Sequence, residues 1–152
     1  MANGNVKKIT NTIAIHNGTA ATLTLTDQPT AETILGGNAR SVLRMDLSAF
    51  TEVRLTAKVG VVGAAASVVR AKFGPTTEFS TTAANYTNIG YGPSSVECSM
   101  AALGTVDSGW KKINPAAQTE VNVAFFTQGG DATLDPALDN LLIHFRTPDL
   151  FI

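Results

Sequence analysis

Charged residues are scarce in this sequence. Only 15% of the 152 residues are Asp, Glu, Lys or Arg, against roughly 25% in an average soluble domain. The 12 acidic and 11 basic side chains nearly cancel, and the formal net charge is −1. Binding to a nucleic-acid backbone needs an excess of Lys and Arg that displaces counterions from the phosphates. We therefore expect no nucleic-acid partner.

Cysteine and long apolar runs are also nearly missing. A single cysteine, Cys98, cannot form an internal disulfide or a thiolate metal cluster. The longest apolar run, residues 59–66, contains two glycines and is far shorter than the ~20 residues that span a bilayer. The two N-terminal lysines are not followed by the apolar stretch of a signal peptide. We expect no membrane segment and no Sec-type export.

The sequence does contain a clear hydrophobic period of two, which is the period of a β-strand. In residues 52–59, four apolar side chains (Val53, Leu55, Ala57 and Val59) alternate with four polar ones (Glu52, Arg54, Thr56 and Lys58). Such alternation indicates a strand with one buried face and one solvated face. Comparable runs predict further strands in residues 12–15, 22–26, 42–45, 67–73, 95–100, 110–113, 120–127 and 140–146.

Clusters of Gly, Pro, Asn and Asp separate these runs and mark turns. Short strands divided by turns, with no long helical pattern, predict an all-β protein with one antiparallel β-sandwich of about eight or nine strands. Short helical turns are expected at residues 31–35 and 116–120. Residues 59–66 join two predicted strands, and we expect a hairpin loop there rather than a phosphate-binding loop.

The chain divides into three parts. We expect a short extended N-terminal arm over residues 1–10, because its first eight residues are mostly polar and lack the strand pattern. The sandwich domain then occupies residues 11–147, with a C-terminal tail over residues 148–152. That tail ends in three apolar residues, which we expect to dock on their own domain or on a neighbouring molecule.

No set of catalytic residues is recognisable. Nucleophilic catalysis needs a Ser, Thr or Cys beside a base, but the two histidines, His16 and His144, lie in predicted strands near the polar face. Cys98 also lies in a predicted strand, where it is expected to be a small buried hydrophobe. The sequence contains no G-x-S-x-G motif. We expect a non-enzymatic protein with no catalytic residues and no cofactor.

Two groups of residues are candidates for ligand binding. Asp131, Asp135 and Asp139 form the only acidic cluster and could supply oxygen ligands to Ca²⁺. Their spacing does not fit an EF-hand loop, however, and turn capping explains Asp beside Pro or Asn equally well. Tyr91 and Trp110 could stack on a sugar ring. For Trp110, which follows a glycine and precedes Ile113 by three residues, we instead predict burial in the core.

Residues 46–146 resemble a jelly-roll β-sandwich domain that recurs in structural proteins of tailed bacteriophages. The resemblance lies in DLSAFTEVRLTAKVGVVGAAASVVRAKF, in the later SGW, and in GGDATLDPALDNLLIHFR before the tail. The upstream segment QPTAET is similar to the Met-Pro-Ala-x-x-Thr-Glu region of the same family. Relatives often carry a hairpin with Asp and Trp where this chain has residues 73–79, which lack both. The first 20 residues have no counterpart.

The resemblance implies a jelly-roll topology and a place in the phage particle. Small virion proteins of this kind include head decoration (cement) proteins, which are typically trimers with arms that reach neighbours. We therefore expect a capsid decoration protein made in the host cytoplasm and located at the virion surface. Its expected partners are copies of itself, as a homotrimer, and the major capsid protein. The expected interface residues are Val6, Lys7, Lys8, Ile9, Leu150, Phe151 and Ile152.

The alternative function is a carbohydrate-binding module for host adhesion on a head fibre or tail. Jelly-roll domains also occur in lectins. The residues available to face a sugar are Asn85, Tyr86, Tyr91 and Trp110. The missing Asp and Trp of the 73–79 hairpin weaken this alternative.

Overall fold

The computed structural model describes residues 10–16, 23–24, 32–35, 42–48, 50–74, 86–88, 96–113, 121–129 and 135–147. All regular secondary structure within these ranges is β, as the sequence predicts. None of the described segments forms a helix with the length and apolar character that a bilayer crossing requires. The strands are β1 (Thr10–His16), β2 (Leu23–Thr24), β3 (Thr33–Ile34), β4 (Val42–Met45), β5 (Glu52–Val61), β6 (Val68–Gly74), β7 (Thr87–Asn88), β8 (Val96–Ser99), β9 (Gly104–Asp107), β10 (Lys111–Lys112), β11 (Val121–Gln128) and β12 (Ala137–Arg146).

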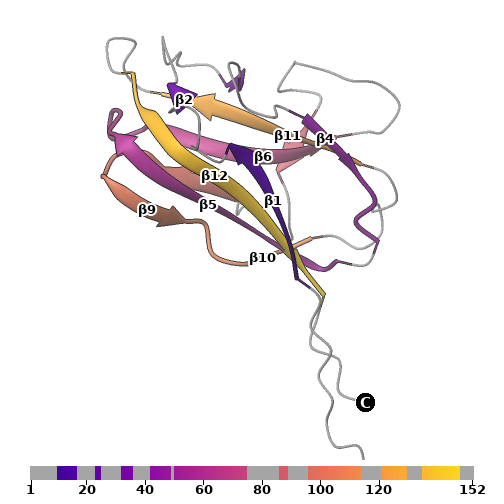
Figure 1. The fold of residues 1–152 in the computed structure, drawn as a ribbon. Coiled ribbons are helices and arrows are strands. Elements are labelled where there is room, and N and C mark those ends of the chain that lie inside the picture. The colour runs from indigo at the N-terminus through magenta and orange to yellow at the C-terminus, as the bar shows by residue number, and fades with distance from the viewer. Residues whose placement is uncertain are drawn as a thin grey trace, which may run out of the picture.

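These strands form two antiparallel sheets (Figure 1). In the first sheet β5 pairs with β12 along its whole length. The free side of β12 carries β1 and β2 in one row, and the free side of β5 carries β9 and β10 in another. In the second sheet β11 pairs with β6. There β3 and β4 share the row beside β11, while β7 and β8 share the row beside β6.

The rows reproduce the jelly-roll order. When the rows are numbered along the chain, the described strands of the first sheet run 1–8–3–6 and those of the second run 2–7–4–5. Each sheet therefore combines two rows from the first half of the chain with two rows from the second half. This order is the double Greek key of a jelly roll. The prediction of a jelly-roll sandwich with about eight or nine strands is confirmed by these eight rows, several of which contain two of the described strands.

The core fills the space between the two sheets. Alternate residues point into it from Val53 to Val59 of β5 and from Leu141 to Phe145 of β12, and Val53, Leu55, Leu141, Ile143 and Phe145 are fully buried there. From the second sheet, Val69, Ala71, Val123 and Phe125 meet them. Because side chains alternate between faces, the polar residues between these positions lie on the outer faces of the sandwich.

Two local predictions were wrong. Residues 33 and 34 form strand β3 rather than a helical turn, since these two β-branched residues pair with Phe126 and Thr127 of β11. The loop after β5 is not a hairpin, because β5 and β6 belong to different sheets. Gly63 donates to the Met100 carbonyl and Met100 donates to Ser67, so this loop is bound to the end of β8. The other predicted turn, 116–120, lies outside the described residues.

The two ends of the sandwich differ in what they carry. Thr10, the last residue of the expected arm, begins β1 and pairs with Arg146 at the end of β12. Thr10, which follows residue 9, and Arg146, which precedes Thr147, therefore lie side by side at one end of the first sheet. The β5–β6 loop lies at the opposite end, where Val61 pairs with Ala137 at the start of β12.

Replacing Leu141 with Ala tests the importance of the inter-sheet core. Leu141 is fully buried, so we expect the free energy of unfolding to fall by about 2–5 kcal/mol in urea titrations. Leu142, the next residue on the opposite face of β12, is only half-buried, and the matched change Leu142→Ala should cost clearly less. Equal losses at the two positions would contradict the assigned core.

Candidate functional site

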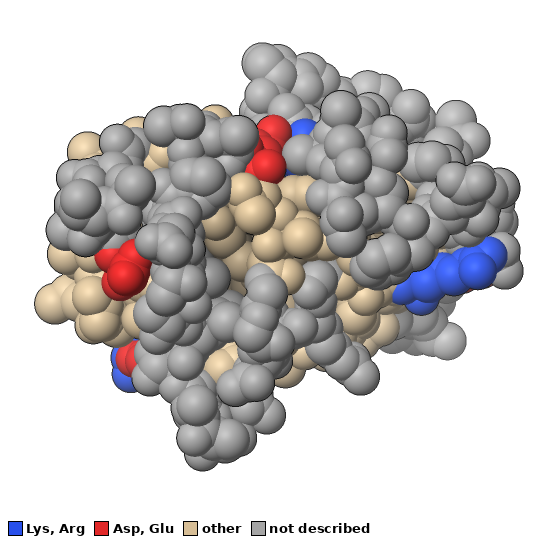
Figure 2. Space-filling view, turned by 90° about the horizontal axis from the view of Figure 1, so that it is seen from above, with Lys and Arg blue, Asp and Glu red and all other residues tan. Residues whose placement is uncertain are grey.

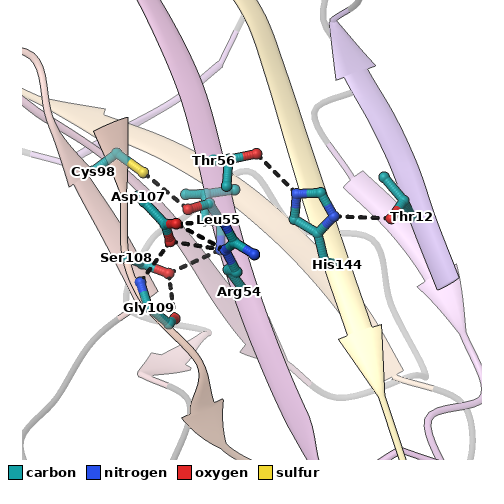
Figure 3. Close-up of polar contacts among 9 residues, drawn as sticks. All are labelled: Thr12, Arg54, Leu55, Thr56, Cys98, Asp107, Ser108, Gly109 and His144. Atoms are coloured by element: carbon teal, nitrogen blue, oxygen red, sulfur yellow. Dashed lines mark hydrogen bonds and ion pairs between the residues drawn. The ribbon is translucent and has the colours of Figure 1, made fainter. Parts of the chain in front are cut away.

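A cluster of polar and aromatic side chains lies on the outer face of the first sheet, and Figure 3 shows its polar contacts around His144 and Arg54. Thr12 of β1, His144 of β12 and Arg54 of β5 are direct cross-strand partners, so they share this face. One register step further, Arg146 lies opposite Glu52. We call this group the outer-face cluster; its members are Thr12, Glu52, Arg54, Thr56, Asp107, Trp110, His144 and Arg146.

His144 links three strands. One imidazole nitrogen, Nδ1, lies 2.8 Å from Oγ1 of Thr12, and Nε2 lies 2.8 Å from Oγ1 of Thr56. A hydroxyl can donate or accept, so both nitrogens of a neutral imidazole are satisfied in either tautomer. Burial lowers the pKa of His144, and the positive charge of Arg54 adds to this, whereas Asp107 opposes it. The geometry holds His144 as a neutral bridge between β1, β12 and β5.

Arg54 and Asp107 form an ion pair between β5 and β9. Nε of Arg54 lies 2.9 Å from both carboxylate oxygens of Asp107. Hydrogen bonding to Arg54 is the largest cause that lowers the pKa of Asp107, and it outweighs the opposing effect of burial. Both side chains are more than a third exposed, so we expect the pair to fix geometry more than to add stability.

The turn after β9 positions Trp110. Gly109 has φ of +72°, a backbone conformation that favours glycine, and its N–H donates to Asp107 at 2.7 Å. Ser108 accepts a hydrogen bond from the backbone N–H of Leu55 at 2.9 Å and donates to the Gly109 carbonyl. These contacts bind the turn to β5 and direct the chain toward the outer face.

Trp110 lies on this outer face and not in the core, so the prediction of a core tryptophan was wrong. Its ring centroid lies 4.1 Å from the guanidinium carbon of Arg146 and 5.8 Å from that of Arg54. The His144 ring meets it edge-on, with the ring centroids 6.4 Å apart. Cation–π attraction to two arginines holds the half-buried indole against the sheet, and Glu52 pairs with Arg146 at 2.8 Å.

The other sugar-facing candidates are not gathered around Trp110 in the described structure. Tyr86 is only 4% exposed and packs on Phe126, with the ring centroids 5.5 Å apart, on the second sheet. Stacking of Tyr86 on a sugar would therefore require it to leave this contact. Asn85 and Tyr91 lie outside the described residues.

The predicted interface residues also fall outside the described ranges. These are Val6, Lys7, Lys8, Ile9, Leu150, Phe151 and Ile152. Of the metal candidates, Asp131 is likewise outside, Asp135 is exposed and Asp139 is half-buried beside Gly60. Within the described ranges, no group of three or more His, Cys, Asp or Glu side chains is arranged to hold a metal ion.

Cys98 and His16 are buried. Burial is the main cause that raises the pKa of the Cys98 thiol to about 12, and the thiol donates to the Leu55 carbonyl at 3.2 Å. Cys98 is therefore a poor nucleophile at neutral pH. His16 ends β1 with its Nε2 buried and without a hydrogen-bond partner in the described structure.

A second charged network, on the outer face of the second sheet, was missed by the sequence reasoning. Arg70 pairs with Glu97 at 2.6 Å and with Glu32 at 3.0 Å, and Glu32 also pairs with Lys72 at 3.1 Å. Lys72 is buried despite its charge. Alternation placed Arg70 and Lys72 on this face, but their acidic partners are 27 to 40 residues away along the chain. No spacing in the sequence predicts ion pairs between residues so far apart along the chain.

Comparisons of the chain with models of protein families, with curated proteins and with solved structures found no match.

Replacing His144 with Gln tests the neutral bridge. Because the folded-state pKa of His144 lies below its ordinary value of 6.5, the unfolded chain takes up a proton first as the pH falls. The stabilising contribution is therefore complete above about pH 6.5 and declines as the pH drops through the folded-state pKa. Wild type should lose stability relative to His144→Gln between neutral and acidic pH in urea titrations. Parallel pH profiles would contradict this assignment.

Proposed function

We propose that this chain is a non-enzymatic structural protein of a tailed-bacteriophage virion, which decorates and stabilises the capsid. In this proposal it contacts copies of itself, as a homotrimer, and the major capsid protein at the particle surface. Two lines of evidence support it. The sequence resembles jelly-roll proteins of such particles, and the described strands have the jelly-roll order that this resemblance implies. Because one fold hosts many functions, the topology alone does not carry the proposal.

The observation that carries it is the pairing of Thr10 with Arg146. This pairing attaches residues 1–9 and 148–152 at adjacent points of one end of the sandwich. Both segments hold the expected interface residues, and both continue the chain from the same end of the sandwich. An extended segment can bind a neighbour by adding a strand to the edge of its sheet. Stable contacts of this kind bury about 1,600 Å² in total.

The charge distribution is consistent with a surface covered by other subunits. Many of the few charges are paired within the chain, as in Glu52–Arg146, Arg54–Asp107 and Arg70–Glu97. On the side seen in Figure 2, the charged side chains of the described residues lie in small separate groups among uncharged ones. Charged residues are depleted at the centres of protein interfaces, so a low density of free charge supports the proposal.

Deletion of residues 1–9 tests the proposed arm and leaves β1, which begins at Thr10, intact. Binding to bare capsids should weaken by at least about tenfold, or about 1.4 kcal/mol, when measured by co-sedimentation. The control replaces residues 1–9 with a Gly/Ser segment of equal length, which keeps the chain length and removes the side chains. Capsid binding that is unchanged in both variants would contradict the arm's role.

The position of Trp110 favours the alternative, a carbohydrate-binding adhesion module. An aromatic ring on an outer sheet face, beside Arg54, Arg146 and His144, offers stacking together with hydrogen-bond donors. A glycan array tests it with wild type and Trp110→Ala. If the alternative holds, glycan signals present in wild type are lost in the variant. No wild-type signal above background would contradict the alternative.

A further inference from the structure

The end of the sandwich opposite Thr10 and Arg146 carries exposed apolar side chains, with the half-buried Asp139 beside Gly60 as its neighbouring charge. All three large apolar side chains that are exposed in the described structure lie here: Val61 at 51%, Val62 at 39% and Leu103 at 69%. We call residues 60–66 and 101–103 the apolar tip. Four exposed alanines at positions 65, 66, 101 and 102 extend it. An apolar patch on an otherwise polar protein surface marks an interaction site.

The two segments of the apolar tip are held together at both ends. Val59 of β5 pairs with Gly104 of β9. Four residues after Val59 and four residues before Gly104, the N–H of Gly63 donates to the Met100 carbonyl at 2.9 Å. These two contacts bracket residues 60–62 on one segment and residues 101–103 on the other. The three exposed apolar side chains therefore lie on two short segments that are joined at the same end of the sandwich.

The tip is held firmly enough to act as a preformed surface. Met100 is fully buried and donates to the carbonyl of Ser67, which is also fully buried. A Cβ atom on Gly63 would lie 2.6 Å from the Ser67 hydroxyl oxygen and 3.1 Å from Pro136. The backbone at Gly63 thus packs closely against its surroundings. The small residues of the tip would let large side chains of a partner approach closely.

The apolar residues at the end of this chain cannot reach the tip of their own molecule. Val61 pairs with Ala137, and the ten residues of β12 from Ala137 to Arg146 span about 30 Å. Six residues connect Arg146 to Ile152, and a fully extended segment of that length covers only about 20 Å. Leu150, Phe151 and Ile152 can therefore meet an apolar tip only on another copy.

We propose that the apolar tip of one copy binds Leu150, Phe151 and Ile152 of a second copy. This inference rests on the proposed function, in which the tail docks on a neighbouring subunit, and it names the surface that receives the tail. The contact joins opposite ends of two identical molecules and is heterologous. Such contacts repeat from copy to copy and form a ring when the rotation closes. Closure after three copies would produce the expected trimer.

Sedimentation of two complementary variants of the full chain tests this contact. Leu103→Asp places a charge in the tip, and deletion of residues 148–152 removes the tail. Wild type should form an oligomer larger than a dimer, whereas each variant alone should be a monomer. An equimolar mixture contains one intact tip and one intact tail, so it should form a dimer and nothing larger.

The controls separate the contact from effects on folding. Thr105→Asp adds the same charge at an exposed position of β9, two residues from Leu103 and outside the tip, and it should assemble like wild type. Circular dichroism and thermal unfolding show whether each variant is folded. A wild-type monomer would overturn the inference, and so would a tail-deleted variant that still assembles or a mixture that stays monomeric.

Self-association is measured without capsids, so the two proposals can fail separately. A chain that assembles but does not bind capsids contradicts only the proposed function. A chain that binds capsids as a monomer contradicts the contact between tip and tail and the homotrimer, but leaves capsid binding itself unaffected.

Discussion

The antiparallel pairing of β5 with β12 is the constraint on which the rest of the structure depends. It runs from Glu52 and Arg146 at one end to Val61 and Ala137 at the other. One face of this pair buries Leu55 and Ile143 against the second sheet, and the burial of such side chains is the main driving force for folding. The neighbouring strands β1 and β9 add to the two free sides of the same pair.

The same pairing also determines where the molecule can meet others. Its outer face carries His144 and Arg54, which tie β1 and β9 to the central strands. One end attaches the N-terminal and C-terminal segments side by side, and the other end carries the apolar tip around Val61. A heterologous contact needs different surfaces at separate places on one rigid body. The length of β12 supplies that separation.

Local alternation was sufficient to predict the strands that bury one face, as in residues 52–59, 67–73 and 140–146. It could not predict features that depend on distant partners. The position of Trp110 follows from the turn at Gly109 and from Arg146, which is 36 residues away along the chain. Strand β3 forms because β11 offers it an edge, and the passage of residues 62–67 between sheets depends on the whole topology. The predicted arm and tail contacts involve other molecules, so they stay predictions.

In the proposed contact, opposite ends of the sandwich bind each other in neighbouring copies. Disulfide cross-linking between Leu103→Cys and Phe151→Cys, made in separate full-length chains of different mass, tests it most directly. The native Cys98 should not react, because it is buried with the pKa of its thiol raised to about 12. We predict that mild oxidation of the mixture yields disulfide-linked dimers containing one chain of each kind. Dimers of like chains only, or no cross-linked product, would contradict the contact between the apolar tip and the tail.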